Sequence, residues 1–436
     1  MLKTAAMIAI LASSSLAAED LFVVRAIDSE TGRGVPMVEL ETVHHLKFVT
    51  DNAGVAVIDS PELMNEKVFF HVRSHGYEFP KDGFGYRGQQ LLMEPGAEFE
   101  LKLKRINLAE RLYRITGAGL WADSIRAGLE TPVAEPLLNS KVLGSDSAHK
   151  VEYGGKFFWI WGDTHRLRYP LGNFQVTAAT SPLDFDPETG IELDYFPDER
   201  GFTRKMAPLP VDGPTWLDAL VTLTDAQGVE RLGATYVKVK PPLTVYERGL
   251  CEFDPVGKVF KAIHKLPLEA PAPEGHPFRH EGQLFFGNAL PDLKMPDCYE
   301  AWRDPTTWEA LESKGDFGKI KVHRGSIAWS KFRQRWTFVF TQSQGDSSLL
   351  GEIWYAESTS PTEGWADPVK ILTHDRYTFY NPLQHPEFSR GDGQYLYFEG
   401  TYTTTFSGNP VPTPRYDYNQ ILYRLDLAAP RLNSAK

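Results

Sequence analysis

The chain has 436 residues, which is enough for two or three domains with buried cores. Apolar residues make up 42% and charged residues 24%, as in ordinary globular proteins, which excludes a disordered or collagen-like chain. The net charge of −11 argues against nucleic acid or an anionic membrane surface as a partner and favours a neutral or cationic ligand.

Residues 1–18 have the features of a secretory signal peptide. Lys3 precedes a short apolar run, and Ser15-Leu16-Ala17 fits the small-x-small pattern at which signal peptidase cleaves. A membrane anchor is the alternative, but this run is far shorter than the about 20 residues that span a bilayer, as is every later apolar stretch. We therefore expect a secreted or periplasmic protein without an integral membrane segment after signal removal.

Residues 19–105 alternate short strand-like runs with turn signals, which predicts a small antiparallel β-sandwich. The expected strands are 21–27, 37–42, 55–58, 68–72 and 98–103. The opening Asp28-x-x-Thr31-Gly32-x-x-Val35-Pro36 and the later Thr50-Asp51-x-x-Gly54 turn resemble the regulatory-like sandwich modules of exported bacterial proteins. The resemblance implies a structural or spacer role for this domain.

A connector, residues 106–116, follows. Leu108, Leu112 and Ile115 stand near helical spacing, so the segment 107–113 is predicted to be a short helix. The rest of the chain, 117–436, is rich in strand-like runs broken by Gly and Pro and contains no long amphipathic pattern. It is predicted to be a second, larger all-β domain.

The second domain contains an internal repeat. Residues 153–163, 254–263, 331–341 and 390–399 each combine a polar or Gly-containing turn with an adjoining strand-like run, aromatic-rich in most copies. Repeated strand–turn–strand units are typical of β-propeller blades, each of which is one twisted sheet. The unit length predicts a five-bladed propeller, with six blades left open. A sandwich or jelly roll is the alternative, because short strands do not by themselves define a closed ring.

Carboxylates recur at similar places in these repeats. Asp146 precedes Asp163 by 17 residues, and Asn381 precedes Glu399 by 18. A tight turn brings the distal ends of its two strands together, so each pair should meet at one mouth of the propeller. Cleavage of a glycosidic bond needs one protonated and one ionised carboxyl group. Asp146, Asp163 and Glu399 are therefore the predicted catalytic residues; the alternative is a turn role for the two aspartates and a buried structural partner for Glu399.

The motif Trp159-Ile160-Trp161-Gly162-Asp163-Thr164, with Asp146 upstream, resembles the first blade of secreted five-bladed propeller glycoside hydrolases. It is most similar to the group that includes endo-acting D-arabinan hydrolases. Residues 351–361, followed by Gly364-Trp365, resemble a blade end common in propellers that act on sugars. The resemblance implies Asp146 and Asp163 as the catalytic pair and a polysaccharide or oligosaccharide as the substrate, without identifying the sugar.

Six further residues are candidates for binding the substrate: Trp161, Glu281, His323, Tyr380, His385 and Arg415. The aromatic rings would stack on a sugar, and the polar groups would bond its hydroxyls. Each has a structural alternative: most aromatic residues belong to the core, isolated histidines are usually satisfied within the fold, and Arg415 can pair with Asp417.

No cofactor is expected, because the sequence has no spaced metal-ligand motif, no P-loop and no Gly-x-Ser-x-Gly elbow. Cys251 and Cys298 are too few for a disulfide framework and either pair or stay free. Two other functions remain open. One is a non-catalytic carbohydrate-binding or cell-surface scaffold propeller. The other is a glycoside phosphorylase, whose phosphate would need a cationic pocket formed from Arg166, Arg168, Arg279, His323 and Arg324.

Overall fold

The computed structural model describes residues 21–210 and 213–432, without the side chains of 170–173; the predicted signal peptide lies outside this range. The all-β prediction is confirmed, since the described chain is almost entirely strands and turns. The short helices are α1 (Ala122–Arg126), α2 (Tyr299–Arg303) and the 3-10 turns η2 (Pro61–Leu63), η3 (Asn139–Lys141), η4 (Pro305–Thr307), η5 (Pro386–Phe388) and η6 (Pro430–Leu432). No helix in the described ranges is long and apolar enough to cross a membrane.

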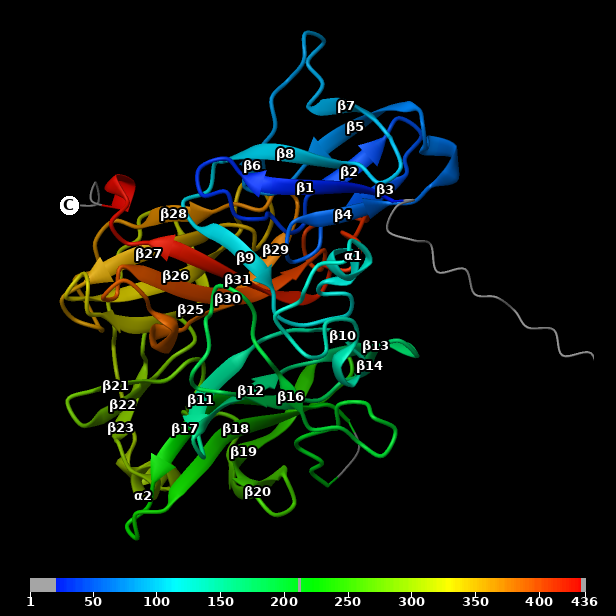
Figure 1. Ribbon diagram of the computed structural model, residues 1–436. Helices are drawn as coiled ribbons and strands as arrows, with labels where there is room; N and C mark the ends of the chain where they lie inside the picture. Colours follow the sequence, from blue (N-terminus) through cyan, green and yellow to red (C-terminus); the bar gives the residue numbers. More distant parts are fainter. Residues whose placement is uncertain (1–20, 211–212, 433–436) are drawn as a thin grey trace, which may run out of the picture.

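Residues 22–105 form two four-stranded sheets, drawn in blue at the top of Figure 1. One has the order β4 (Val55–Ile58), β1 (Phe22–Asp28), β8 (Glu98–Arg105), β6 (Tyr77–Glu78), and the other β3 (Lys47–Val49), β2 (Glu39–Thr42), β5 (Lys67–Arg73), β7 (Gly88–Leu92). Burial alternates in β8 and in β1 from Val24 onwards, as expected for strands with one core face, whereas Val23 packs on the opposite face with Val55 and Val57. Contrary to the sequence prediction, the sheets are not antiparallel throughout, because β1 pairs parallel with β8. Val24, Leu40, Phe70 and Leu101 belong to one core cluster, so the two sheets share a single core.

The described residues after 105 form five four-stranded antiparallel sheets, which we number in chain order. The first is β11 (His149–Tyr153), β12 (Lys156–Trp161), β15 (Thr177–Ser181), β16 (Asp194–Tyr195); the second is β17 (Thr215–Thr224), β18 (Glu230–Lys240), β19 (Thr244–Asp254), β20 (Val259–Leu266); the third is β21 (Phe278–His280), β22 (Gln283–Phe286), β23 (Leu293–Pro296), β24 (Glu309–Ala310). The fourth is β25 (Lys321–Ser330), β26 (Arg335–Ser343), β27 (Ile353–Ser358), β28 (Val369–Leu372), and the fifth is β29 (Thr378–Gln384), β30 (Tyr395–Thr403), β31 (Asn419–Asp426), β9 (Glu110–Arg114). A small sheet of β10 (Val142–Ser145), β13 (Thr164–Arg166) and β14 (Tyr169–Asn173) is also present.

The helix predicted for residues 107–113 is wrong. Residues 110–114 form β9, which pairs antiparallel with β31, so that Leu422 lies opposite Tyr113. All five residues of β9 are buried, which means that both faces of the strand pack against protein. A strand buried on both faces has no alternating pattern, and its apolar spacing then imitates that of a helix.

Apolar clusters join each sheet to the next one in chain order. Phe158 of the first sheet packs with Leu232 of the second, and further clusters join the second sheet to the third, the third to the fourth and the fourth to the fifth. Another cluster contains Trp159 of the first sheet and Tyr397 of the fifth. The fifth sheet therefore packs on the first as well as on the fourth.

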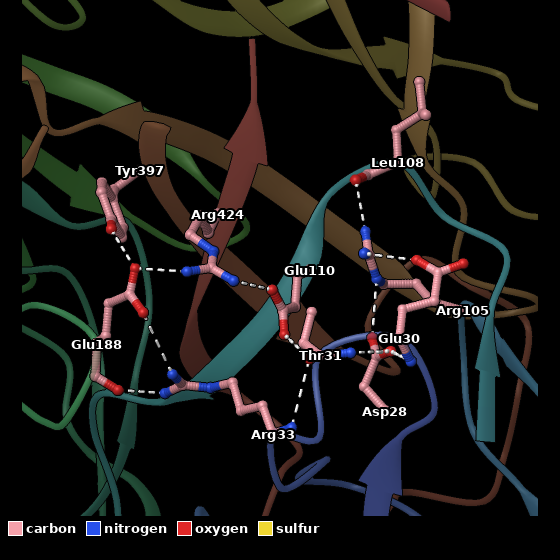
Figure 2. A network of polar contacts seen from close by, with 10 residues as sticks. All are labelled: Asp28, Glu30, Thr31, Arg33, Arg105, Leu108, Glu110, Glu188, Tyr397 and Arg424. Atoms are coloured by element: carbon pink, nitrogen blue, oxygen red, sulfur yellow. Dashed lines mark hydrogen bonds and ion pairs between the residues drawn. The ribbon is translucent and has the colours of Figure 1, made fainter. Parts of the chain in front are cut away.

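A polar network attaches the N-terminal domain to the larger part of the chain (Figure 2). Thr31, in the turn after β1, donates a hydrogen bond to Glu110 of β9, with 3.0 Å between the oxygens. Arg424 of β31 bonds Glu110 and also donates to Glu188 at 2.6 Å. Arg33 bonds the carbonyl of Glu188. The two N-terminal sheets are thus joined to the rest of the described chain through β9 and through the segment of Glu188.

Candidate active site

A cavity of about 400 Å³ lies where the first strands of several sheets begin. We call it the carboxylate cavity because its lining includes four acidic residues: Asp146, Asp163, Asp218 and Glu274. Asp146 precedes β11, Asp163 follows β12, Asp218 lies in β17 and Glu274 precedes β21. Residues of the first, second and third sheets therefore supply carboxyl groups to one space.

Irregularities in the strands place several of these side chains. The register of β17 with β18 shifts after Asp218, that of β25 with β26 shifts around Arg324, and that of β29 with β30 shifts around Asn381. Asp218, Arg324 and Asn381 all line the carboxylate cavity. A β-bulge re-aims a side chain that a regular strand would direct elsewhere. The same device in three sheets turns polar groups towards one cavity.

Asp146 and Asp163 lie next to each other across two chain segments. The backbone N–H of Asp146 donates to the carbonyl of Asp163 at 3.3 Å, and that of Gly162 donates to the carbonyl of Asp146 at 2.8 Å. A Cβ atom on Gly162 would stand 2.3 Å from Oδ1 of Asp146, so only glycine leaves room for this carboxyl group. The close packing of Asp146 therefore explains why a glycine precedes Asp163 in the sequence motif Gly162-Asp163.

The pKa of Asp163 is raised to about 7. Burial is the main cause, because it disfavours the charged form, and the neighbouring charge of Asp146 acts in the same direction. A hydrogen bond of 2.8 Å from Nε1 of Trp216 partly opposes this shift. Asp163 is thus a carboxyl group that holds its proton up to about neutral pH.

Asp146 is also buried, and burial raises its pKa. The hydroxyl groups of Tyr380 and Tyr418 donate hydrogen bonds to its carboxylate, the former at 2.8 Å, and these favour the ionised form. The environments of the two carboxyl groups differ, because Asp146 accepts hydrogen bonds from two tyrosine hydroxyl groups, whereas Asp163 accepts one from the indole of Trp216. Of the two groups, Asp146 is the better suited to carry a negative charge.

Asp218 and Glu274 come with basic partners. Oδ2 of Asp218 lies 3.5 Å from Nη1 of Arg324, which is its ionic partner. Its Oδ1 lies 3.5 Å from Nε2 of His149, a neutral imidazole because burial lowers the pKa of His149 to about 3. Oε1 of Glu274 lies 3.4 Å from Nη2 of Arg248. The pKa of Glu274 is raised, first by burial and then by the charge of Asp218. These two carboxylates are therefore positioned by ion pairs.

The structure does not bring Glu399 into the carboxylate cavity, contrary to the prediction. Glu399 lies opposite Leu383 in the β29–β30 pairing, where it is fully buried, and its Oε1 stands 3.0 Å from Nε2 of His385. Burial raises the pKa of Glu399 to about 8 and lowers that of His385. Asn381, expected beside Glu399, instead donates to Ser147 at 2.8 Å. Glu399 and His385 form a buried pair outside the carboxylate cavity.

Four other candidates also lie away from this cavity. Trp161 is buried and stacks on Trp159, with 6.0 Å between ring centroids. Glu281 stands on the exposed turn between β21 and β22, with 83% of its side chain accessible. His323 is exposed on β25. Arg415 pairs with Asp123 at 3.8 Å rather than with Asp417. Tyr380 is the one proposed binding residue that contacts a cavity carboxylate, through Asp146.

Sequence reasoning missed Asp218, Glu274, Trp216 and Arg248. Asp218 and Glu274 stand in or just before the first strands of the second and third sheets, a position equivalent to that of Asn381. A search for polar residues at the beginning of every first strand would have found them. Within the described residues there is no group of three or more His, Cys, Asp or Glu that could hold a metal ion, and Cys251 and Cys298 are both free.

No protein-family model and no curated protein matches the sequence. Neighbours among solved structures are glycoside hydrolases. An exo-β-1,3-galactanase from Phanerochaete chrysosporium has a TM-score of 0.44 and 10% identity, over 73% of this chain and 64% of that one. An exo-β-1,3-galactanase from Clostridium thermocellum (TM-score 0.40, 9% identity, 64% and 59% covered) and an α-L-arabinofuranosidase from Fusarium graminearum (0.36, 11%, 69% and 84%) are similar at the same level.

Proposed function

We propose that the protein is an exported glycoside hydrolase in which an N-terminal β-sandwich precedes a five-bladed β-propeller. Each of the five sheets would be one blade. Two observations support a closed ring of blades. Every sheet packs on its neighbours, and the fifth sheet packs on the first. In addition, all five sheets, or the segments that lead into them, contribute residues to one cavity. The sandwich is supported by the single core that the two N-terminal sheets share.

The observation that carries the enzymatic proposal is the pair of unlike carboxyl groups, Asp163 and Asp146, in a cavity of about 400 Å³. Hydrolysis of a glycosidic bond requires a carboxylic acid that protonates the leaving oxygen and an ionised carboxylate that activates water or attacks the sugar. Asp163 retains its proton to about pH 7, and Asp146 is bonded by two tyrosine hydroxyl groups. Environments that separate two carboxyl groups in this way define the acid and the base.

In the proposed reaction Asp163 donates a proton to the departing oxygen, and Asp146 acts as the base or nucleophile. Glu274 replaces Glu399 as the third carboxylate, where it would bind substrate hydroxyls beside the reacting bond. The substrate is a neutral polysaccharide or oligosaccharide, because Arg248 and Arg324 are already paired with Glu274 and Asp218. Trp216, which lines the cavity, offers an aromatic wall for a sugar ring.

The test incubates the full chain with a panel of plant, algal and bacterial glycans and measures new reducing ends. Asp163→Asn should reduce turnover by about 10²–10⁴-fold, which is the contribution of general acid catalysis. Glu281→Gln is the matched control, since it changes a carboxylate on an exposed turn, and should retain full activity. An unchanged rate in Asp163→Asn, with the fold intact by circular dichroism, would remove the assignment.

The same assay separates the two competing functions. A non-catalytic carbohydrate-binding or scaffold protein would retain glycans without releasing reducing ends. A phosphorylase would depend on inorganic phosphate. We do not favour it, because the two arginines on the cavity are neutralised by carboxylates, and Arg279 likewise pairs with Asp297 at 2.8 Å.

A further inference from the structure

The first strands continue beyond the carboxylate cavity to a second space on its far side. His149 and His276 stand between the carboxylate cavity and this second space, with 4.7 Å between their ring centroids. His149 lines both spaces. Beyond the two histidines lie cavities of about 400 Å³ and about 750 Å³. We call these two cavities together the far cavity. They have six lining residues in common: Ala328, Trp329, Lys331, Gln384, Pro386 and Glu387.

Three of the first strands, β17, β25 and β29, contribute residues to both the carboxylate cavity and the far cavity. Asp218, Arg324 and Asn381 line the carboxylate cavity, whereas Leu220, Ser326 and Leu383, each two residues further on, line the far cavity. The far cavity is therefore a separate space along the same strands and not an extension of the carboxylate cavity.

The far cavity has an aromatic wall that the fold leaves open. Trp329 of β25 is 42% exposed although it lines a concave surface. Its ring is held by Trp336 of β26, edge to face at 5.5 Å, and Trp336 in turn packs on Phe278 of the third sheet. A large aromatic ring that is fixed from behind and exposed in front can stack on the apolar face of a ligand with little loss of side-chain entropy.

The charged groups around the far cavity are largely occupied within the protein. Nζ of Lys150 lies 2.6 Å from Oε2 of Glu387, and Nε of Arg279 lies 2.8 Å from Oδ2 of Asp297. The Arg390 guanidinium donates to three backbone carbonyls. Ion pairs thus compensate the charges of Lys150 and Arg279. The other charged side chains of the lining include Lys331, Arg390 and Asp392, which are of both signs, so the far cavity presents no wall of a single charge to an ionic ligand.

We propose that the far cavity is a second glycan-binding site that holds a neutral polysaccharide through stacking on Trp329. The volume suits this role, since ligand sites span about 300–1,000 Å³. The choice of a glycan, rather than another neutral ligand with an apolar face, rests on the proposed function. Such a site would keep the enzyme on polymeric substrate while the carboxylate cavity cleaves it.

The test uses native gel electrophoresis of the full chain in gels that contain debranched arabinan, β-1,4-galactan or mixed-linkage β-glucan, with polygalacturonate as the acidic comparator. The Asp163→Asn background prevents degradation of the polymer. At least one neutral polymer should retard the protein, and Trp329→Ala should weaken that binding about tenfold. Trp329→Tyr, which keeps an aromatic face, should restore most of it. Phe332→Ala is the matched control, because Phe332 is 40% exposed yet lies outside the lining of the far cavity.

The proposal fails if no neutral polymer retards the protein, if only polygalacturonate does, or if Trp329→Ala migrates like its background. Its failure is distinct from that of the proposed function. Trp329→Ala in the otherwise native chain should cleave short oligosaccharides at an unchanged kcat/KM. Retardation that depends on Trp329, in a protein that cleaves nothing, would retain the second site and overturn the hydrolase. Thermal unfolding of each variant verifies that the fold persists.

Discussion

Trp216 of the second sheet donates a hydrogen bond from Nε1 to Oδ1 of Asp163, which follows β12 of the first sheet, over 2.8 Å. The side chain that would act as the acid is thus oriented by a residue of the neighbouring sheet. This contact favours the ionised form of Asp163, while burial and the charge of Asp146 favour the protonated form and prevail. The packing between two sheets therefore adjusts the pKa of the site.

The pH profile of kcat/KM should report this contact. If Asp163 donates a proton, activity falls above about pH 7, where its pKa lies. Trp216→Phe removes a hydrogen bond that lowers the pKa, so the alkaline limb should move to higher pH, even if KM also rises. An alkaline limb that stays in place in this variant would contradict the role of Asp163.

Tyr380→Phe should act on the opposite limb. The Tyr380 hydroxyl donates to Asp146 and stabilises its charge, so its loss raises the pKa of Asp146. The acidic limb of the profile should then move to higher pH, and kcat/KM at pH 6 should fall about tenfold, as expected for a hydrogen bond to a charged group. Tyr86→Phe, on an exposed loop of the N-terminal domain, is the control and should leave the profile unchanged.

Glu399 and His385 should influence stability rather than catalysis. Burial raises the pKa of Glu399 to about 8, so between pH 6.5 and 8 the folded state binds a proton that the unfolded state has lost. Its contribution to the free energy of unfolding therefore falls as pH rises through this window. Below pH 6.5 the lowered pKa of His385 acts in the opposite sense.

Glu399→Gln removes the ionisable group, and its melting temperature should decline less than that of the native chain between pH 6.5 and 8. The expected difference is on the order of a few degrees. Differential scanning calorimetry at several pH values measures it. Parallel curves for the two proteins would show that Glu399 is already ionised in the folded state, and loss of activity at pH 6 would give it a role in the reaction.

Arg424→Ala should destabilise the contact between β9, β31 and the segment of Glu188, to which Thr31 and Arg33 of the N-terminal sheets bond. Arg424 bonds both Glu110 and Glu188 in a largely buried setting, and removing one partner of such a group costs about 3–5 kcal/mol. The midpoint of urea unfolding should fall. Arg25→Ala, which breaks the exposed pair with Glu98, should change stability by about 1 kcal/mol or less. Equal effects of the two substitutions would mean that the two ion pairs of Arg424 together contribute no more than one surface ion pair.

The local features of the fold were accessible from the sequence. Alternating burial in β1 and the turn around Asp51–Gly54 are short-range patterns, and the Gly162-Asp163 motif identified the two neighbouring aspartates. The helix predicted at 107–113 failed for a tertiary reason. The partner of β9 is β31, about three hundred residues later, and contact with protein on both faces removed the alternation that marks a strand.

The amino-acid sequence by itself determined the all-β class, the repeating strand units and the proximity of Asp146 to Asp163, because these depend on turns and periods within a few residues. Only the tertiary structure decided which other groups join them. Asp218 and Glu274 reach the cavity because β17 and the segment before β21 begin there, and Glu399 is excluded because its strand turns it towards His385. Such placement depends on how separate sheets pack, and no local pattern encodes the packing of residues so far apart in the chain.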